Sequence, residues 1–365
     1  MTIQRDLSKY DEQALKDAER WTEIDGDLDG VDPTVAAAIL TSRCETMRYD
    51  HPRTERWHDP EDVDVIADIP YLPDGGYDVT VGQVRGHLLD IYLPHEAAVR
   101  MSNVTPVYVD IHGGGFCYGY KELNRNFNTH LAQQGFAVVS LNYRPAPQTD
   151  LKGQLADVQA ALRWLKAHLA DYPVDPNAVF ITGDSAGGAL ALLTLAIENS
   201  GRAAEAFGIG QASGIGQASG IGQASGIGFK GGALVCGVYS LASPERAAGR
   251  GVAYGTERKN LESTLGSGFF AGLDAADPDF LTAPDIVANV DLPPLFLLTS
   301  ADDFIQAETL ALATALARKG TDFELHDWKP ARHDSLGHVF PVCMTWREES
   351  LRTLADIRRF SYDRC

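Results

Sequence analysis

Long apolar segments, clustered cysteines and a basic charge excess are all missing from this sequence of 365 residues. The longest apolar stretch is about half of the ~18 residues that a membrane-spanning helix needs. The five cysteines lie far apart and form no Cys-x-x-Cys pair, which argues against a disulfide framework and a structural zinc site. The segment Met1 to Asp6 carries no apolar core of a signal peptide, so we expect a cytoplasmic protein.

Basic residues are outnumbered by acidic ones. Lys and Arg total 31 against 50 Asp and Glu, which gives a net charge of −19. Such a surface repels phosphate backbones and anionic lipid headgroups, so neither a nucleic acid nor a membrane is an expected partner. The hydrophobic share of 44% is near the globular average, and the chain is long enough for one large α/β domain. The composition predicts a soluble protein of enzyme size.

The N-terminal segment, residues 1–58, is helical in pattern. A first helix is predicted from Asp6 to Ile24, and a second begins with Asp32 as N-cap and Pro33 in the first helical position. The acidic stretch from Asp25 to Gly30 imitates the start of a calcium loop. The twelfth position of such a loop needs a bidentate Glu, and Ala36 stands there instead, so we interpret the stretch as a turn between helices.

Strand patterns begin at Val63. Two antiparallel strands are expected at Val63–Ala67 and Val84–Leu93, with a turn near Asp74 to Gly76. Further strands are expected at Val107–Ile111, Phe136–Leu141, Val179–Thr182, Ala233–Tyr239, Leu295–Thr299 and Phe323–Asp327. Helical patterns separate these strands, and a last helix is expected at Thr345–Phe360. Alternating strands and helices predict an α/β fold with a mostly parallel sheet and helices on both faces.

A low-complexity segment interrupts this alternation at residues 208–228. The hexapeptide Gly-Ile-Gly-Gln-Ala-Ser occurs three times, and a fourth copy begins at Gly226. Three copies supply only about one coil of a β-helix, which needs several coils to bury its core. We therefore predict a glycine-rich surface loop. The alternative is a contact between copies of the chain through Ile209, Ile215 and Ile221, which would make the protein a homo-oligomer.

The strongest chemical motif is Gly183-Asp184-Ser185-Ala186-Gly187, which lies between a predicted strand and a predicted helix. In this setting Gly-x-Ser-x-Gly forms a sharp turn that exposes the serine hydroxyl at a helix N-terminus. Upstream, another buried strand leads into His112-Gly113-Gly114-Gly115. Three glycines in a row allow backbone N–H groups to approach a developing oxyanion without side chains in the way. Together these motifs predict a nucleophilic Ser185.

A nucleophilic serine needs a base and an acid that orients the base, in the chain order Ser, acid, His. The strand ending at Thr299 is followed by Asp302 and Asp303. Asp302 leaves the strand first and is predicted to orient the base, while Asp303 is expected to begin the following helix. The next strand is followed by His333 and His338, of which we favour His338, which precedes the last helix, while His333 lies earlier.

These motifs resemble the hormone-sensitive-lipase-like branch of the α/β-hydrolases, the bacterial carboxylesterases. The resemblance covers the chain from about Val63 onward. It rests on His112-Gly113-Gly114-Gly115, Asn142-Tyr143-Arg144-Pro145-Ala146-Pro147, Gly183-Asp184-Ser185-Ala186-Gly187-Gly188, Leu292-Pro293-Pro294 and His338-Val339-Phe340. It implies a triad of Ser185, Asp302 and His338, with the N–H groups of Gly114, Gly115 and Ala186 as oxyanion donors. Two positions depart from the family, Gln148 in place of an acid and Ala189 in place of an amide.

The resemblance also implies the organisation and the activity. Residues 59–240 and 291–365 would form the catalytic domain, and residues 1–58 and 241–290 a cap over it. The expected reaction is hydrolysis of short-chain, acetyl-like esters, with a small-molecule ester as partner and neither a cofactor nor a metal. The motifs do not separate an esterase from an amidase, formamidase or lactonase. A receptor without catalysis is disfavoured because Ser185, Asp302 and His338 are all present.

Overall fold

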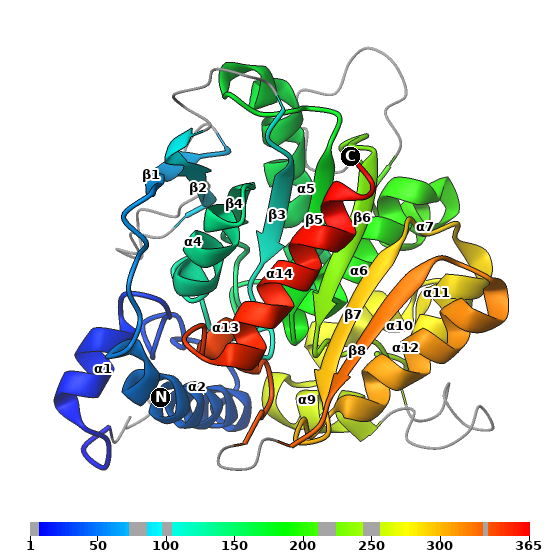
Figure 1. Ribbon diagram of the computed structural model, residues 1–365. Helices are drawn as coiled ribbons and strands as arrows, with labels where there is room; N and C mark the ends of the chain where they lie inside the picture. The colour runs from blue at the N-terminus through cyan, green and yellow to red at the C-terminus, as the bar shows by residue number, and fades with distance from the viewer. Residues whose placement is uncertain (1–6, 73–85, 97–103, 211–223, 244–255, 331–334) are drawn as a thin grey trace.

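The computed structural model contains an eight-stranded sheet in the order β1-β2-β4-β3-β5-β6-β7-β8 (Figure 1). The structure describes residues 7–72, 86–96, 104–210, 224–243, 256–330 and 335–365. The strands are β1 Val63–Pro70, β2 Leu88–Pro94, β3 Val107–Ile111, β4 Ala137–Leu141, β5 Val179–Asp184, β6 Phe229–Val235, β7 Leu295–Ser300 and β8 Phe323–Trp328. β2 runs antiparallel to β1 and β4, and the strands from β4 to β8 are parallel to one another. The predicted α/β fold with a mostly parallel sheet is confirmed.

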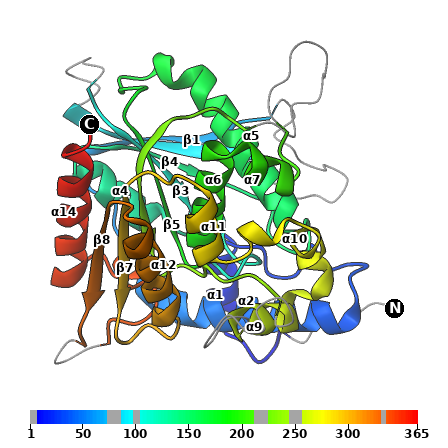
Figure 2. The same ribbon diagram turned by 90° about the vertical axis from the view of Figure 1, so that its right-hand side faces the viewer.

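Helices cover both faces of the sheet (Figure 2). One face packs against α4 Arg125–Gln133, α13 Phe340–Cys343 and α14 Glu348–Tyr362. The other packs against α5 Leu151–His168, α6 Ala186–Asn199, α7 Gly201–Ala206, α11 Ala283–Asn289 and α12 Gln306–Lys319. Strands β3, β4, β5 and β7 are buried along their whole length, because both of their faces are covered. Within the described ranges, no helix is both long and apolar enough to cross a membrane.

Helices α1 Glu12–Ala18, α2 Pro33–Thr54 and α9 Thr256–Leu265 lie at the end of the sheet where the parallel strands finish (Figure 1). The other short elements are α10 Ala271–Asp274 and the 3-10 turns at Leu169–Asp171, Ser267–Phe270 and Pro278–Phe280. α2 begins as predicted, since the Asp32 carboxylate accepts the N–H groups of Thr34 and Val35. α2 and α9 contact each other although about 200 positions separate them in the chain.

Several element boundaries differ from the predicted ones. β6 begins at Phe229 and ends at Val235, because Cys236 adopts a positive φ of 49° that a strand does not tolerate. The last predicted helix, Thr345–Phe360, is α14, which begins three residues later than predicted, and the short α13 precedes it outside the predicted range. The turn predicted near Asp74 lies outside the described residues, as do the first two residues of the strand predicted from Val84.

The two ends of the hexapeptide repeat are part of the core, which the prediction of a surface loop missed. Ile209 and Ile227 are both buried in the core on the α6 side of the sheet. The carboxylate of Glu198 accepts the N–H groups of Ser225 and Gly226 and the Ser225 hydroxyl. The Ala224 N–H reaches the Gly210 carbonyl at 3.3 Å. Residues 211–223, including Ile215 and Ile221, lie outside the described part of the chain, and the alternative of an oligomer contact stays a prediction.

Candidate active site

Ser185 stands at the turn between β5 and α6, at the end of the sheet where α2 and α9 lie (Figure 1). Its backbone has φ 51° and ψ −117°, a strained conformation that is costly for any residue other than glycine. The turn is tight enough that a Cβ on Gly187 would come within 1.9 Å of the Ile111 carbonyl oxygen. Glycine at this position therefore allows the elbow to press against β3, and the turn presents the Ser185 hydroxyl at the N-terminus of α6.

His338 contacts Ser185 on one side and an aspartate on the other. Its Nε2 lies 2.9 Å from Ser185 Oγ, and its Nδ1 lies 2.8 Å from Oδ1 of Asp303. The three side chains come from separate places in the chain, after β5, after β7 and after β8. With Nδ1 protonated toward the carboxylate, Nε2 is free to accept the hydroxyl proton, which is the relay that nucleophilic catalysis by serine requires. Of the two predicted histidines, His333 lies outside the described residues.

The prediction that Asp302 orients the histidine is wrong in this geometry. The carboxylate of Asp302 accepts the N–H of Leu336 at 2.9 Å and so supports the loop that precedes His338. Asp303 lies beside the imidazole, where Asp302 was predicted, because β7 is followed by a turn in which the Asp303 N–H bonds to the Ser300 carbonyl. That turn directs the second aspartate, and not the first, toward the imidazole. Two adjacent acids after a strand carry no signal that would have told them apart.

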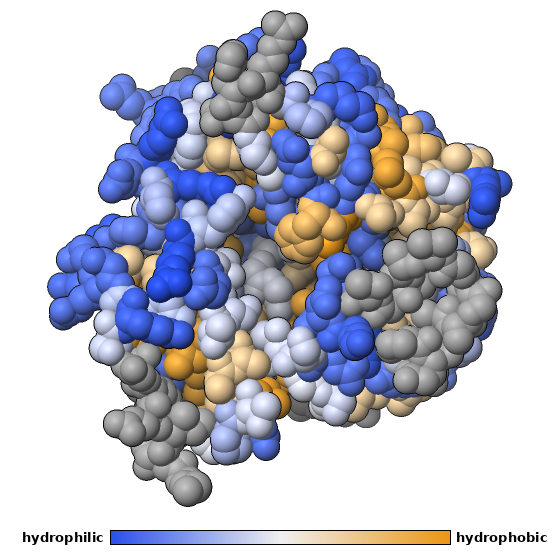
Figure 3. All heavy atoms as spheres, turned by 90° about the horizontal axis from the view of Figure 1, so that it is seen from below, coloured by the Kyte–Doolittle hydropathy of each residue, from blue (hydrophilic) through white to orange (hydrophobic). Residues whose placement is uncertain are grey.

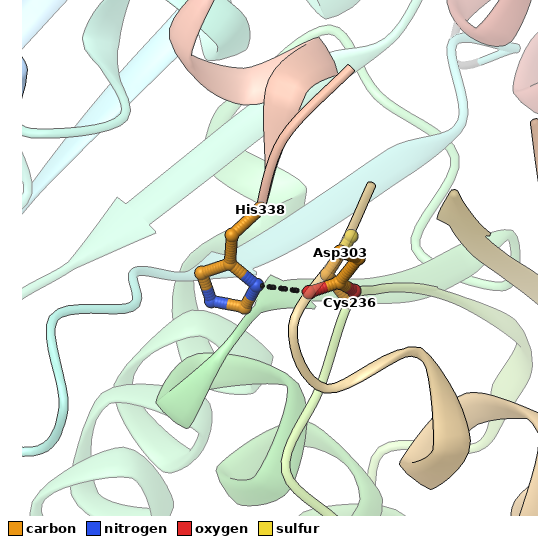
Figure 4. A group of neighbouring side chains, drawn as sticks. All are labelled: Cys236, Asp303 and His338. Atoms are coloured by element: carbon orange, nitrogen blue, oxygen red, sulfur yellow. Dashed lines mark hydrogen bonds and ion pairs between the residues drawn. The ribbon is translucent and has the colours of Figure 1, made fainter. Parts of the chain in front are cut away.

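Asp303 accepts hydrogen bonds from other donors besides His338, whose contact with the carboxylate is drawn in Figure 4. Thr299 Oγ1 donates to Oδ2, and the N–H of Ile305 donates to Oδ1. Burial alone would raise the pKa of Asp303, but the hydrogen bonds and the charge of His338, with smaller contributions from Ile305 and Cys236, lower it below its ordinary value. The carboxylate therefore stays ionised and fixed in orientation beneath the imidazole.

Cys236 completes the group drawn in Figure 4. Its sulfur, an Asp303 carboxylate oxygen and a His338 ring nitrogen lie within 4.8 Å of one another, and these are ligand types that zinc accepts. The carboxylate is already engaged by hydrogen bonds from three residues, and burial raises the pKa of the Cys236 thiol far above its usual range. A neutral thiol is a weak hydrogen-bond donor and a poor metal ligand, so we interpret the group as support for the histidine.

The glycine loop after β3 faces Ser185. Gly114 has φ 103° and Gly115 has φ 58°, and a Cβ on Gly114 would lie 1.9 Å from the Tyr118 carbonyl oxygen. Among the described residues, no acceptor receives the N–H groups of Gly114, Gly115 or Ala186. Gly114, Gly115, Ala186 and Ser185 line the same cavity. Unpaired backbone donors beside a nucleophile suit the stabilisation of a developing oxyanion.

A buried polar network ties this loop to the serine elbow. The Asp184 carboxylate accepts the N–H of Gly113 at 3.0 Å and the Asn124 amide at 2.8 Å. The same Asn124 amide donates to Asp110, which also accepts from Asn128. Burial, only partly offset by these donors, raises the pKa of Asp110 to about 7 and raises that of Asp184. The network fixes the spacing between the two motifs that the sequence singled out.

The N-terminal segment braces the chain that follows the glycine loop. Arg43 on α2 is fully buried, and its two terminal guanidinium nitrogens, Nη1 and Nη2, donate to the Asp27 carboxylate at 2.6 and 2.9 Å. Its Nε donates to the Cys117 carbonyl, and Nη2 donates to the Ala146 carbonyl. Gln148, which stands where the family carries an acid, donates to Asp27. The acidic stretch predicted to be a turn is therefore a turn, and its Asp27 supplies a carboxylate next to Gln148, which sequence reasoning did not foresee.

A cavity of about 740 Å³ opens above Ser185. Figure 3 faces this end of the molecule, where apolar and hydrophilic residues meet around a hollow. Its walls come from the glycine loop, the elbow, the segments that carry Asp302 and His338, and the cap helices α2 and α9. Phe304, which is 75% exposed, lies at this cavity with its ring centroid 4.6 Å from that of His338. The volume falls within the range of pockets that enclose a small-molecule ligand.

The fold and these motifs define an α/β-hydrolase. The chain belongs to the family described as the α/β hydrolase fold, whose profile matches residues 108–337, and the predicted hormone-sensitive-lipase-like branch is confirmed.

Among curated relatives, the probable carboxylic ester hydrolase LipM of Mycobacterium tuberculosis is 35% identical over 134 residues, which are 36% of this chain and 30% of that protein. Lipase 2 of a Moraxella species is 45% identical over 95 residues, which are 26% of this chain and 22% of that protein. The aligned stretches thus span less than a third of these relatives.

Solved structures match over a larger share of the chain. The crystal structure of esterase B from Lactobacillus rhamnosis superposes with a TM-score of 0.71 at 29% identity, covering 90% of this chain and 94% of that one. A second structure of that esterase, at 28% identity, is inhibited by a tributyrin phosphonate. The esterase from Pyrobaculum calidifontis matches with a TM-score of 0.61 at 21% identity, over 88% of this chain and 92% of that one, and shows the shared fold.

Proposed function

We propose that this protein is a serine carboxylesterase with Ser185 as nucleophile, His338 as general base and Asp303 as the residue that orients the base. The observation that carries the proposal is the pair of contacts on one imidazole, 2.9 Å to Ser185 Oγ and 2.8 Å to Asp303 Oδ1. The unpaired N–H groups of Gly114, Gly115 and Ala186 beside the same cavity support it.

In the proposed mechanism, His338 takes the proton of Ser185 as Oγ attacks the ester carbonyl carbon. The tetrahedral oxyanion accepts hydrogen bonds from the three backbone N–H groups, which are already in place and cost no reorganisation during the reaction. His338 then protonates the leaving alcohol, and an acyl group remains on Ser185. Water, activated by the same imidazole, releases the acid and restores the serine.

The comparisons support the reaction class. Two relatives from Mycobacterium tuberculosis and one from a Moraxella species carry names of ester hydrolases. The esterase from Lactobacillus rhamnosis matches this chain over nearly its whole length. The phosphonate in that esterase's inhibited structure is a tributyrin derivative, an analogue of a short-chain ester. These names describe those proteins, and they make an ester the first substrate to test on this chain.

Short acyl groups, from acetyl to butyryl, are the proposed acyl range. Two polar residues in the stretch after the glycine loop do not bear on this range. Lys121 and Asn126 in that stretch are buried, and Lys121 is paired with Asp68, Asp90 and Glu122, so these groups do not contact a substrate. The proposed acyl range depends on the acidic surface and on the polar side chains of α2 and α9 that line the cavity.

Amidases, formamidases and lactonases share the proposed chemistry, because each forms an acyl-enzyme through the same groups. A ligand receptor is disfavoured, since the strained elbow at Ser185 and its contact with His338 would serve no purpose in a protein that only binds.

The test is a panel of p-nitrophenyl esters from acetate to decanoate, with an arylformamide and a lactone alongside. We expect hydrolysis of the short esters with a burst of one p-nitrophenol per chain, and a decline of kcat/KM beyond butyrate. Ser335→Ala, which changes another serine of the same cavity, is the matched control for Ser185→Ala. A chain that hydrolyses none of the esters with Ser185 intact would contradict the proposal.

A further inference from the structure

The two cap helices turn matching polar faces toward the cavity above Ser185. On α2 the lining residues are Ser42, Glu45, Thr46, Tyr49 and Asp50, spaced by three and four positions as one helical face requires. On α9 the lining residues are Glu257, Asn260, Leu261 and Thr264, with the same spacing. Hydroxyl, amide and carboxylate groups thus lie on the cavity sides of α2 and α9, while apolar side chains such as Leu123, Val238 and Val342 line other parts of the same cavity.

These groups differ in depth. Glu45 and Asn260 are exposed and lie at the rim, whereas Thr46 and Thr264 are half-buried. Asp50 is 5% exposed, and burial, opposed by a hydrogen bond from Tyr118, raises its pKa to about 7. A polar wall therefore extends from the opening down to a buried carboxyl group.

A second, independent observation comes from the opposite wall. Asn124 lines the same cavity and is 1% exposed. Its amide nitrogen donates to Asp110 and Asp184, while its Oδ1 has no partner among the described residues. An unpaired buried acceptor costs roughly 1–3 kcal/mol, so a ligand hydroxyl that donates to it would be favoured.

We propose that the natural substrate is an ester whose alcohol half carries several hydroxyl groups, such as a sugar or another polyol. This inference rests on the proposed esterase function. A short acyl group occupies a small part of a 740 Å³ cavity, so most of the space is left for the alcohol. Carboxylate and carbonyl oxygens of the cavity can accept hydrogen bonds from the hydroxyl groups of the alcohol. The hydroxyls of Thr46 and Thr264 can serve as hydrogen-bond partners for the alcohol's remaining oxygen atoms.

Other substrate chemistries fit less well. The carboxylates of Glu45, Asp50, Glu257 and Asp302 disfavour an anionic alcohol or acyl half. A long alkyl chain would displace water from the half-buried hydroxyls of Thr46 and Thr264 without forming hydrogen bonds to them, which is costly. A quaternary ammonium alcohol would suit the carboxylates but would leave the hydroxyl and amide groups unused.

The experiment compares two acetyl esters of a hydroxymethyl group on a six-membered ring, methyl 6-O-acetyl-glucopyranoside and cyclohexylmethyl acetate, with acetylcholine as a third substrate. Each hydroxyl hydrogen bond is worth up to about tenfold, so we expect kcat/KM for the sugar ester to exceed that for the cyclohexyl ester by at least about tenfold. Equal values, or a preference for acetylcholine, would overturn the inference while leaving the esterase function intact. Hydrolysis of none of the three would instead count against the proposed function itself.

A pair of variants on one helix assigns the preference to the cavity face. Thr46 and Thr41 both bond to the carbonyl four residues earlier, but only Thr46 lines the cavity. Thr46→Val should reduce the sugar-to-cyclohexyl ratio about threefold or more, mainly through KM for the sugar ester. Thr41→Val should leave the ratio unchanged. A ratio that responds equally to both, or to neither even when Thr264→Val is added, would contradict a role for this face.

Discussion

The Asp303 carboxylate lies 2.8 Å from Nδ1 of His338 and holds the imidazole with Nε2 directed at Ser185. This contact decides which of two adjacent acids serves the histidine. Asp302 supports the same loop through the N–H of Leu336, without touching the imidazole. The two aspartates therefore have separable tasks.

Replacement of each aspartate by asparagine tests this division. Asp303→Asn should lower kcat by about 10⁴, because an amide cannot hold the required tautomer or stabilise the imidazolium. Asp302→Asn keeps an oxygen that accepts the Leu336 N–H, so kcat should change less than about threefold. Steady-state kinetics on a p-nitrophenyl ester, with melting temperatures for both variants, measures this. A larger loss in Asp302→Asn than in Asp303→Asn would reverse the assignment.

The sequence predicted the features that have a local cause. Gly183 must be glycine because a Cβ there would lie 2.4 Å from the carbonyl oxygen of Gly187, four residues along the same turn, and that requirement appears in the sequence as a motif between a strand and a helix. The alternation of buried strands and helices likewise predicted the sheet. Asp32 and Pro33 marked the start of α2 for the same kind of local reason.

Features that depend on distant contacts were not predictable. The choice of Asp303 depends on a turn after β7, and the end of β6 depends on the positive φ of Cys236. The pairing of Arg43 with Asp27 brings together two residues 16 positions apart. The hydrogen bond from Arg43 to the Cys117 carbonyl joins residues 74 positions apart. No periodicity or motif records such contacts, because they arise only when the chain has folded and distant segments pack together.

His112 gives the protein a specific weakness toward acid. Its burial lowers its pKa to about 4 from the ordinary value of 6.5, with a small opposing effect of the Gly113 carbonyl. In the unfolded chain His112 therefore binds a proton near pH 6.5, whereas in the folded chain it binds one only near pH 4. Because the unfolded state binds the proton first, the free energy of unfolding falls as the pH falls between these values.

The expected loss from this residue is about 3 kcal/mol between pH 7 and pH 4. In His112→Gln that contribution is absent, so the variant's free energy of unfolding should fall less steeply over the same range. Urea unfolding at a series of pH values measures both slopes. Parallel curves for the two proteins would show that His112 titrates normally in the folded state.

The buried ends of the hexapeptide repeat and the length of the repeat can be tested by separate variants. Deletion of residues 214–219 removes one copy and keeps both Ile209 and the stretch Ser225 to Ile227. Loop closure changes by only a few tenths of a kcal/mol, so melting temperature and kcat/KM should stay nearly unchanged. Ile209→Ala should instead cost about 2–5 kcal/mol, because that side chain is 2% exposed in the core.

The sheet gives the reason for expecting unchanged activity. The described ends of the repeat join the end of α7 to the start of β6, opposite the end of the parallel strands where Ser185 lies. Loss of activity in a folded protein that lacks residues 214–219 would contradict this placement. Light scattering of the same variant reports whether the repeat contributes to an oligomer.

Arg43 should link the cap to catalysis. Arg43→Met leaves the Asp27 carboxylate buried without its partner and removes the donor to the Cys117 carbonyl, so the stability loss should be about 3–5 kcal/mol. Because Cys117 follows the glycine loop, we also expect kcat to fall more than KM rises. Arg48→Met, on the exposed side of α2, is the control and should change neither quantity appreciably. Equal effects of the two substitutions would show that the buried pair is not a brace.

The central claim is that Ser185 forms the acyl-enzyme, and covalent labelling tests it most directly. The protein would be treated with a fluorophosphonate, digested, and the modified residue identified by mass spectrometry, with loss of ester hydrolysis followed in parallel. We predict one adduct per chain, on Ser185, in step with the loss of activity, and no adduct in Ser185→Ala, whose kcat should be lower by about 10⁶. An adduct on another residue that tracks the loss of activity, or a fully labelled Ser185 with activity retained, would contradict the account.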